Sequence, residues 1–349
     1  MEDIYISKKR RSSDEIEFVY LDESVSPPPQ NEPHERKKKK NKKKKHRLFR
    51  FIASVLIIVF LFISAFIYVF AAASDYTRND LEANEYVSAF ELKSSPLVSN
   101  ILLLGVDGKA ESSSRSDTMI LVSVDFAHMK IKLTSFLRDS WVEIPSKGKK
   151  GKLNSACSHG GPQLVVDTIE YNFGIDIDHY VMVDFDMFTQ IIDSLGGVNV
   201  EVTKKEAKFI NRTTRQTVES GENVHLSGEE ALVYCRIRKL DSDYMRTYRQ
   251  RKVITALIGQ AKTAGISKLL QTMNNVFPLI QTDMSAAEIT ALAYKAGVGV
   301  LAFDIEQNRV PIDEHMSAKT INGQWVEVLD IEATKEYLQD YIYTSKIKE

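Results

Sequence analysis

The stretch RIRKLDSDYMRTYRQR, residues 236–251, contains five arginines and one lysine around two aspartates. Arginine suits phosphate recognition because its planar guanidinium group donates two parallel hydrogen bonds and keeps its charge. Arg246, Arg249 and Gln250 are spaced three and four residues apart, so on a helix they share one face. A solvated basic helix tied by its own aspartates would carry the same pattern, and at this point both interpretations stand.

Two aspartates flank a serine-rich loop in GVDGKAESSSRSDTM, residues 105–119. Asp107 follows a short apolar run that is typical of a buried strand, and Asp117 precedes the next such run. Strand ends in α/β folds meet at an open edge, where two carboxylates could share a divalent cation through hard oxygen ligands. The alternative is a pair of turn aspartates that hydrogen-bond to the local backbone.

Two further segments carry groups that suit an anion. Arg138 and Asp139 follow a predicted strand in SFLRDSWVEIP, although a surface ion pair is the simpler interpretation. In KLNSACSHGGP, Gly160 and Gly161 precede a helix begun by Pro162 and could present backbone N–H groups, although a plain turn also fits. Taken together, paired carboxylates, separated arginines and a glycine turn indicate a pyrophosphate site, because phosphoryl transfer depends mostly on positioning and charge neutralisation.

A charge-free apolar segment, residues 51–73, is long enough as a helix to cross a bilayer. Fifty residues precede it, too many for a cleaved signal peptide, so an uncleaved single-pass anchor is predicted. The basic run at residues 36–50 favours a cytoplasmic N-terminus, with everything after residue 74 outside. Residues 1–50 carry 15 Lys and Arg against 9 Asp and Glu, whereas the rest carries 31 against 38, which argues against a nucleic-acid-binding domain.

The chain as a whole is predicted to contain four regions. These are a disordered basic tail at 1–50, the membrane anchor at 51–73, a stalk at 74–98 and an extracytoplasmic domain at 99–349. Strands alternate with helices in the domain, which predicts an α/β fold with helices packed on a central sheet. Its last part, residues 285–349, has helical and then strand-like patterns but no evident chemistry.

The two cysteines, Cys157 and Cys235, lie 78 positions apart. A disulfide is chemically allowed outside the membrane, but two packed free thiols fit the sequence at least as well. Neither cysteine has the spacing of a metal site.

Five sequence blocks occur in the order and spacing of the LytR–CpsA–Psr family of bacterial cell-envelope proteins, which this chain resembles over residues 99–279. The blocks are NILLLGVD…RSDTMILVSVD, SFLRDSWVEIP, KLNSACSHGGP, SLGGVNVEV and LSGEEALVYCRIRK…DYMRTYRQR. The resemblance implies an α/β/α sandwich with a central mixed sheet and an apolar pocket for a polyprenyl chain. It also implies a phosphotransferase that moves an anionic glycopolymer, such as teichoic acid or capsule, from an undecaprenyl-pyrophosphate carrier. The acceptor would be the C6 hydroxyl of N-acetylmuramic acid in peptidoglycan, in a cell envelope of the Gram-positive type.

Position by position, the resemblance implies roles for named residues. Asp107 and Asp117 are expected to hold Mg²⁺ or Mn²⁺, and Lys152 and Asn154 to border the pyrophosphate. The residues expected around the reacting groups are Arg115, Asp117, Arg138, Arg236, Arg238, Asp243, Arg246, Arg249 and Gln250. Asp117 or Asp243 is expected to take the proton of the attacking hydroxyl. The lipid tail is expected to lie in a pocket lined by the helices at residues 162–173 and 186–195.

Two positions depart from the family pattern: Leu137 stands where a proline is usual, and Arg251 where a second glutamine is common. Neither departure removes a charged ligand. A hydrolase that cleaves lipid pyrophosphates with water would use the same site, so it remains an alternative. A membrane-bound sensor or transcriptional attenuator is a second alternative, although residues 1–50 show no helix-turn-helix pattern. The expected partners are therefore a lipid-linked polymer, peptidoglycan and the membrane, and not nucleic acid.

Overall fold

The computed structural model describes residues 63–64, 76–108, 114–263, 268, 271, 275–289, 291–292 and 303–344. The predicted tail at 1–50, and the predicted membrane span apart from Ile63 and Ser64, lie outside the described residues. Among the residues that are described, no helix combines the length and the apolar character needed to cross a bilayer.

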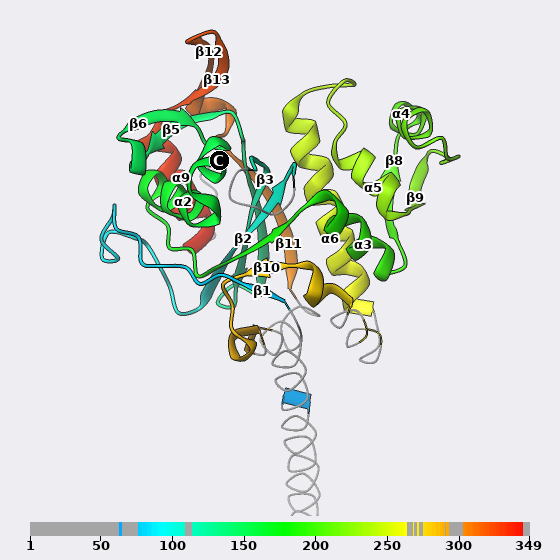
Figure 1. Cartoon of the computed structure of the whole chain (residues 1–349), viewed down its shortest axis with the longest axis horizontal. Coiled ribbons are helices and arrows are strands. Elements are labelled where there is room, and N and C mark those ends of the chain that lie inside the picture. Colours follow the sequence, from blue (N-terminus) through cyan, green and yellow to red (C-terminus); the bar gives the residue numbers. More distant parts are fainter. Residues whose placement is uncertain are drawn as a thin grey trace, which may run out of the picture. The chain divides into compact units, whose positions relative to one another are not determined.

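A seven-stranded mixed sheet forms the centre of the domain (Figure 1), with the strand order β1-β10-β7-β2-β3-β4-β11. Its strands are β1 (Thr77–Arg78), β2 (Val98–Val106), β3 (Ser116–Asp125), β4 (Lys130–Phe136), β7 (His179–Val183), β10 (Gln281–Thr282) and β11 (Asp304–Val310). The strands β2, β3 and β4 are antiparallel neighbours, whereas β7 and β11 run parallel to β2 and β4. The predicted strands at 100–107, 118–125 and 130–136 are therefore confirmed as the middle of a mixed sheet.

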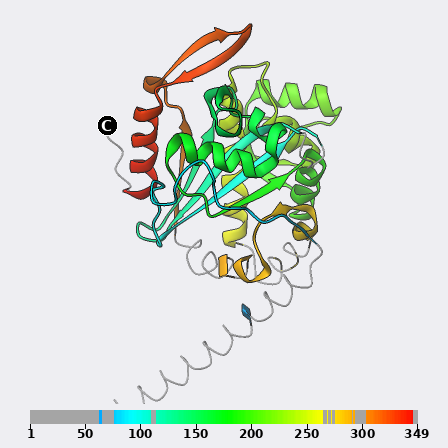
Figure 2. The same ribbon diagram turned by 60° about the vertical axis from the view of Figure 1, so that its left-hand side comes forward.

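Helices cover both faces of this sheet (Figure 2). The longer helices of the described chain are α2 (Ser155–Phe173), α3 (Phe185–Ser194), α4 (Lys204–Thr214), α5 (Gly228–Cys235), α6 (Asp243–Thr263) and α9 (Ile331–Tyr343). Leu102 and Leu104 of β2 pack with α2 and α9 in one core, whereas Leu103 between them faces α6. Central strands that are buried on both faces in this way give the α/β/α layering that was predicted.

Helices α2 and α3 lie on opposite faces of the sheet, so the expectation that both line one lipid pocket is wrong. Tyr180 and Met182 of β7 belong to the core beneath α2. Val181 and Val183 alternate with them and pack with Ile191 of α3 on the other face. In the described residues, one continuous core fills the α2 face, whereas separate hydrophobic clusters divide the α3 and α6 face.

Of the stalk predicted at residues 74–98, the described part, 76–98, is instead part of the folded domain. Strand β1 pairs with β10 at the edge of the central sheet. The Asn84 side chain donates a hydrogen bond of 2.9 Å to Glu170, and Lys93 forms a β-bridge with Ile175. The polar composition of this segment concealed contacts that join it to α2.

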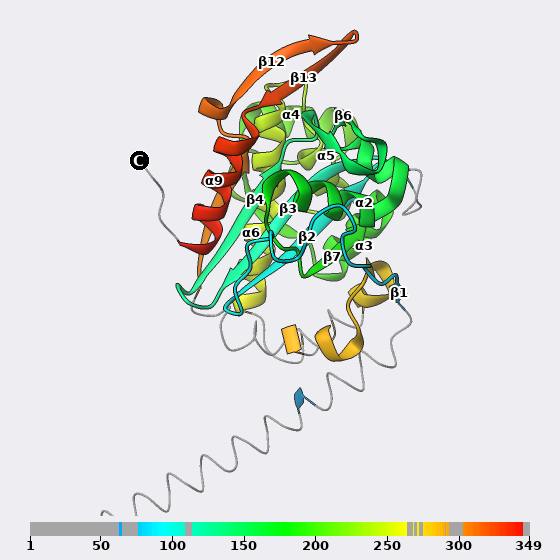
Figure 3. The ribbon, with the colours of Figure 1, turned by 90° about the vertical axis from the view of Figure 1, so that its left-hand side faces the viewer.

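A second sheet of order β12-β13-β5-β6 contains part of the C-terminal region (Figure 3). Its strands are β5 (Ser140–Ile144), β6 (Lys149–Lys152), β12 (Met316–Ile321) and β13 (Gln324–Leu329). The β12–β13 hairpin projects from the domain, and β13 pairs with β5 immediately after Asp139. The region at 285–349 therefore reaches the segment that carries Arg138 and Asp139.

The remaining strands, β8 (Val198–Val202) and β9 (Gly221–Leu226), form a two-stranded sheet apart from the central one. They pack with α4 and α5 around a separate core. Cys235 lies in that core, whereas Cys157 lies in the core under α2. Both cysteines are buried free thiols, so this fold does not pair them.

Glu170 makes the stability of the domain dependent on pH. Burial raises the pKa of Glu170 to about 7 from an ordinary value of 4.5, despite hydrogen bonds from Asn84 and the Ile177 amide. A carboxyl group with a higher pKa in the folded than in the unfolded state binds its proton more tightly when folded, so stability falls as pH rises from about 5 to about 8. We expect Glu170→Gln to raise the melting temperature at pH 8 by a few degrees and to change it little at pH 5. Thermal unfolding followed by circular dichroism tests this, and equal shifts at both pH values would contradict it.

Candidate active site

The central sheet brings the predicted site residues to one edge. Val106 at the end of β2 pairs with Ser116 at the start of β3, so Asp107 and Asp117 follow at neighbouring strand ends. Strand β4 runs antiparallel to β3 and ends at the same edge, where Arg138 follows it. The loop between α5 and α6 and the first turn of α6 supply the remaining groups. The clustering therefore depends on strand register, and not on proximity in the sequence.

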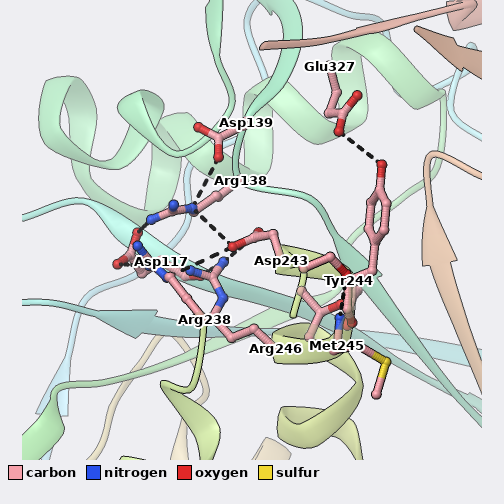
Figure 4. A network of polar contacts seen from close by, with 12 residues as sticks. Asp117, Arg138, Asp139, Arg238, Asp243, Tyr244, Met245, Arg246 and Glu327 are labelled. Carbon is pink, nitrogen blue, oxygen red and sulfur yellow. Dashed lines mark hydrogen bonds and ion pairs between the residues drawn. The ribbon is translucent and has the colours of Figure 1, made fainter. Parts of the chain in front are cut away.

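Asp117 is the centre of an ion-pair network (Figure 4). Its Oδ1 accepts a hydrogen bond of 3.0 Å from Arg138 Nη1, and its Oδ2 accepts one of 3.0 Å from Arg238 Nη2. Arg246 Nη2 donates to the Asp117 carbonyl oxygen at 3.3 Å and to Asp243 Oδ2 at 2.9 Å. Asp243 Oδ1 also lies 3.7 Å from Arg138 Nε and 3.9 Å from Arg238 Nε. We call Asp117, Arg138, Arg238, Asp243 and Arg246 the arginine cluster.

The arginine cluster keeps Asp117 ionised. Burial by itself would raise the pKa of Asp117, but the hydrogen bond from Arg138 and the charges of Arg138, Arg238 and Arg246 hold it below its ordinary value. Asp117 is therefore a weak base at neutral pH. Its role in this arrangement is to hold two guanidinium groups side by side.

The guanidinium group of Arg246 is buried with too few hydrogen-bond acceptors around it. It is 2% exposed, and burial lowers the pKa of its guanidinium to about 10, so the group remains charged at neutral pH. Its Nε and Nη1 atoms are buried and have no hydrogen-bond partner. Buried charged donors without hydrogen-bond partners destabilise a fold. An anion that accepts hydrogen bonds from them recovers the lost stability. The cluster is therefore suited to bind an additional anion.

Lys152 and Asn154 support this cluster from the adjacent turn. Lys152 Nζ contacts Asp139 Oδ1 at 2.6 Å, and Asp139 Oδ2 lies 3.2 Å from Arg138 Nε. The backbone N–H of Asn154 donates to the carbonyl oxygen of Arg138 at 3.1 Å. The two residues predicted to border the site thus fix the position of Arg138 and Asp139.

The glycine pair forms a kink that divides α2 into two helical segments: the first begins at Ser155, and the second begins at Pro162, as predicted. Gly161 has φ 64° and ψ −158°, a conformation that favours glycine, and the helix resumes at Pro162. Burial raises the pKa of Cys157 in the first segment of this helix to about 11, and the charge of Asp107 contributes to the rise. The charge of Asp107 therefore acts at the start of α2.

Arg115 and Arg236 stand outside the ion-pair network. The Arg115 backbone N–H donates to Asp107 Oδ1 at 3.3 Å, and its side chain is exposed. Arg236, also exposed, stacks its guanidinium 4.2 Å from the centroid of the Phe185 ring. Among the contacts of the described residues, none joins either side chain to Asp117 or Asp243.

Arg249 does not belong to the arginine cluster either, contrary to the prediction. Its Nε donates to Glu206 Oε1 at 2.7 Å, and its Nη1 donates to the Ile237 carbonyl at 3.2 Å and to Asp241 at 3.1 Å. These contacts tie α6 to α4 and to the loop that carries Arg238. Gln250 is buried on α6, one turn after Arg246. Arg249 therefore positions the loop of Arg238, and its own donors are engaged.

The predicted metal ligands suit a cation that arrives with a phosphate. Mg²⁺ in proteins is typically bound by one or two carboxylates together with substrate phosphates and water. Asp107 and Asp117 lie at neighbouring strand ends, but both Asp117 oxygens are engaged by arginines. Within the described ranges, no group of three or more His, Cys, Asp or Glu side chains could hold a metal ion. The donor set therefore fits a shared ion better than a permanently held one.

The model of the LytR_cpsA_psr family matches residues 63–340 of this chain. The chain belongs to the LytR–CpsA–Psr family. It is 39% identical over 189 residues to the polyisoprenyl-teichoic acid–peptidoglycan teichoic acid transferase TagU of Halalkalibacterium halodurans. The matched region covers 53% of this chain and 60% of that protein. It is 32% identical over 253 residues to the TagU protein of Bacillus mycoides, which covers 71% of this chain and 78% of that protein.

Solved structures show the same LytR–CpsA–Psr fold. A structure of TagT bound to LIIa-WTA matches with a TM-score of 0.62 and 26% identity, over 76% of this chain and 98% of that one. A structure of TagV from B. subtilis matches with a TM-score of 0.58 and 28% identity, over 71% of this chain and 98% of that one. The family and the mixed α/β architecture inferred from the sequence are therefore confirmed.

Two residues beside the arginine cluster were missed in the sequence, Tyr244 and Glu327 (Figure 4). The Tyr244 hydroxyl donates to Glu327 Oε1 at 2.9 Å. The Glu327 backbone N–H donates to the carbonyl oxygen of Asp139 at 3.0 Å. Tyr244 could have been noticed because it follows Asp243. Glu327 carries no signal in the sequence, because the pairing of β13 with β5 brings it to the site from a distant segment.

Arg246 and Arg249, two of the three buried arginines of α6, should respond in opposite ways to substitution. Arg246→Met removes hydrogen-bond donors that lack partners, so we expect the melting temperature to stay equal or rise while anion binding is lost. Arg249→Met leaves the buried Glu206 without its cation, so we expect the melting temperature to fall by several degrees. Inorganic pyrophosphate should raise the melting temperature of the wild type but not of Arg246→Met. Differential scanning calorimetry with and without pyrophosphate measures all three effects, and a destabilised Arg246→Met would contradict the assignment of Arg246 to anion binding.

Proposed function

We propose that this LytR–CpsA–Psr protein is a phosphotransferase that moves an anionic glycopolymer from a polyprenyl-pyrophosphate carrier to peptidoglycan. The observation that carries the proposal is the arginine cluster, in which Arg246 keeps buried donors without partners. A diphosphate offers several acceptor oxygens to such a cluster. The TagU proteins, named as transferases of teichoic acid from a polyisoprenyl carrier to peptidoglycan, support the choice of donor and acceptor.

The arginine cluster would act by neutralising charge. Arg138, Arg238 and Arg246 would surround the diphosphate and stabilise the lipid phosphate as it leaves, while Asp117 and Asp243 keep the guanidinium groups in place. The exposed side chains of Arg115 and Arg236 are available to bind the outer phosphate oxygens. Asp107 and Asp117 would hold Mg²⁺ or Mn²⁺, which when bound would add positive charge at the phosphate oxygens.

The polyprenyl chain is proposed to lie between the central sheet and α6. Leu103 and Val122 in the middle of the sheet, and Ile254 and Ile258 of α6, are only partly buried on this face. Aliphatic side chains at the centre of a sheet are usually fully buried. Apolar surface left accessible there would be covered favourably by an isoprenoid chain. On the α2 face, by contrast, Leu102, Leu104 and Leu121 in the middle of the sheet are fully or almost fully buried in one core.

The membrane anchor predicted at residues 51–73 remains part of this proposal. It would place the domain outside the cell, where peptidoglycan and the carrier lipid meet. The basic residues at 36–50 favour this orientation by the positive-inside rule.

A transfer assay with labelled lipid-linked polymer tests the function. We expect Arg138→Ala and Arg238→Ala to lower the transfer rate at least about 100-fold, because each removes a cation that stabilises the departing phosphate. Arg212→Ala, which removes an exposed arginine on α4, serves as the matched control and should keep the wild-type rate. Wild-type rates in both cluster variants would refute the assignment of the site.

The same assay separates the transferase from a lipid-pyrophosphate hydrolase. A transferase needs the glycan acceptor, so the lipid-linked polymer should persist when peptidoglycan is omitted. Cleavage at an equal rate without peptidoglycan would show that water is the acceptor and would favour the hydrolase.

The lipid location gives a separate prediction. Val122→Phe places a larger ring on the α6 face of the sheet, so we expect at least about tenfold weaker binding of a long polyprenyl pyrophosphate through steric exclusion. Binding of inorganic pyrophosphate should not change, because Val122 lies away from the arginine cluster. Titration calorimetry with both ligands measures the difference, and unchanged affinity for the polyprenyl ligand would exclude this face.

A further inference from the structure

A pocket of about 220 Å³ lies between the start of α6 and the β12–β13 hairpin. Asp139 and Asp243, which contact Arg138 and Arg246, line one side of it. Trp325 and Ala318 of the hairpin line another side, and Glu327 also contributes to the lining. The pocket therefore borders the proposed diphosphate site and extends away from it.

The hairpin is fixed against the site by backbone pairing. Glu327 pairs with Ser140 in the β13–β5 ladder, and its N–H donates to the Asp139 carbonyl at 3.0 Å. The backbone N–H of Leu137 donates to the Val310 carbonyl, at the end of the strand that precedes the hairpin, at 3.0 Å. A shift of the hairpin would therefore displace the segment that carries Arg138, so the pocket and the arginine cluster are structurally connected.

Glu327 is a buried carboxylate with an unused oxygen. It is 2% exposed; its Oε1 accepts the hydrogen bond from Tyr244, and its Oε2 has no hydrogen-bond partner. Burial raises the pKa of Glu327, and the charges of Asp139 and Asp243 add to this against the opposing effects of Tyr244 and Arg309. Both carboxylate oxygens of Asp117, by contrast, accept hydrogen bonds from arginines. Of these two carboxylates, Glu327 is the better proton acceptor.

The chemistry of the lining indicates an uncharged sugar. Trp325 is 49% exposed and offers an indole ring, beside the apolar side chains of Met316 and Ala318. The charged side chains that line the pocket, Asp139, Asp243 and Glu327, are all carboxylates. A phosphate-bearing polymer would be repelled by them, whereas the hydroxyl groups of a neutral sugar ring would donate to them.

We propose that this pocket binds an uncharged sugar ring of the glycan acceptor, with the ring against Trp325 and one hydroxyl group donating to Glu327 Oε2. The inference rests on the proposed transferase function. In the transfer step, the hydroxyl oxygen forms a bond to the polymer-linked phosphorus, and the bond from that phosphorus to the oxygen of the lipid phosphate breaks. The proton passes to Glu327, and the lipid phosphate leaves with the bonding electron pair.

Sugar binding can be measured without any transfer reaction. The chain has two tryptophans, so a Trp141→Phe background leaves Trp325 as the fluorescent reporter. We expect soluble peptidoglycan glycan fragments to change its emission saturably, and phosphate-bearing teichoic acid fragments to bind at least about tenfold more weakly because of the carboxylates. Ala318→Phe should abolish the change by filling the pocket. Lys319→Phe, on the opposite face of the same strand, is the matched control and should preserve it.

Kinetics then test the role of each side chain. Glu327→Gln should lower kcat about 100-fold and remove the acidic limb of the pH–rate profile, because the wild type needs this group ionised. Its affinity for pyrophosphate should stay unchanged, because Glu327 is not part of the arginine cluster. Trp325→Ala should raise the KM for the acceptor without changing the KM for the lipid-linked donor.

The outcomes separate this proposal from the proposed function. If the wild type transfers polymer but glycan fragments leave the Trp325 emission unchanged, or Glu327→Gln keeps the wild-type kcat, the pocket proposal is wrong and the transferase stands. Equal binding of the phosphate-bearing fragments would likewise overturn it. If the wild type transfers nothing while the fragments still bind at Trp325, the transferase assignment fails and sugar binding stands.

Discussion

The site depends on a buried, positively charged guanidinium group that has more hydrogen-bond donors than the surrounding protein has acceptors for them. Arg246 has two buried donor atoms without a partner, while Arg138 and Arg238 both donate to the carboxylate of Asp117 and lie 3.7 and 3.9 Å from that of Asp243. Such an arrangement is unfavourable in the absence of a ligand and becomes favourable when an anion completes it. The central sheet places Asp117 and Arg138 at one edge, and the α5–α6 loop and α6 bring Arg238 and Arg246 to them.

The contrast between Arg246 and Arg249 shows how one helix serves two purposes. Both are almost fully buried on α6, yet Arg249 satisfies its donors with Glu206, Asp241 and a carbonyl oxygen. Asp243 at the first turn of α6 is favoured there by the helix dipole, and it faces the guanidinium of Arg246. The fully paired arginine fixes the helix and the preceding loop, so the partly paired one can be held ready for a ligand.

The sequence allowed the strands to be predicted from local pattern and the arginines of the cluster from the family resemblance. Apolar runs with turn signals marked β2, β3 and β4, and the family blocks identified Arg138, Arg238 and Arg246. Arg249 was misplaced because helical spacing alone does not say that Glu206, from another helix, would engage it. The segment 76–98 and residue Glu327 could not be assigned, since their positions depend on pairing with strands that are distant in the sequence.

The two residues that depart from the family pattern, Leu137 and Arg251, both interact with the C-terminal segment. A proline at position 137 would have no N–H, so it could not make the hydrogen bond that Leu137 donates to Val310. Arg251 is buried on α6, donates to Ser135 Oγ of β4 at 2.6 Å, and lies close enough to Arg309 for the two charges to interact. Val310 and Arg309 end β11, which leads into the β12–β13 hairpin. The departures are therefore explained by how this chain attaches its hairpin, and they leave the charged groups of the arginine cluster in place.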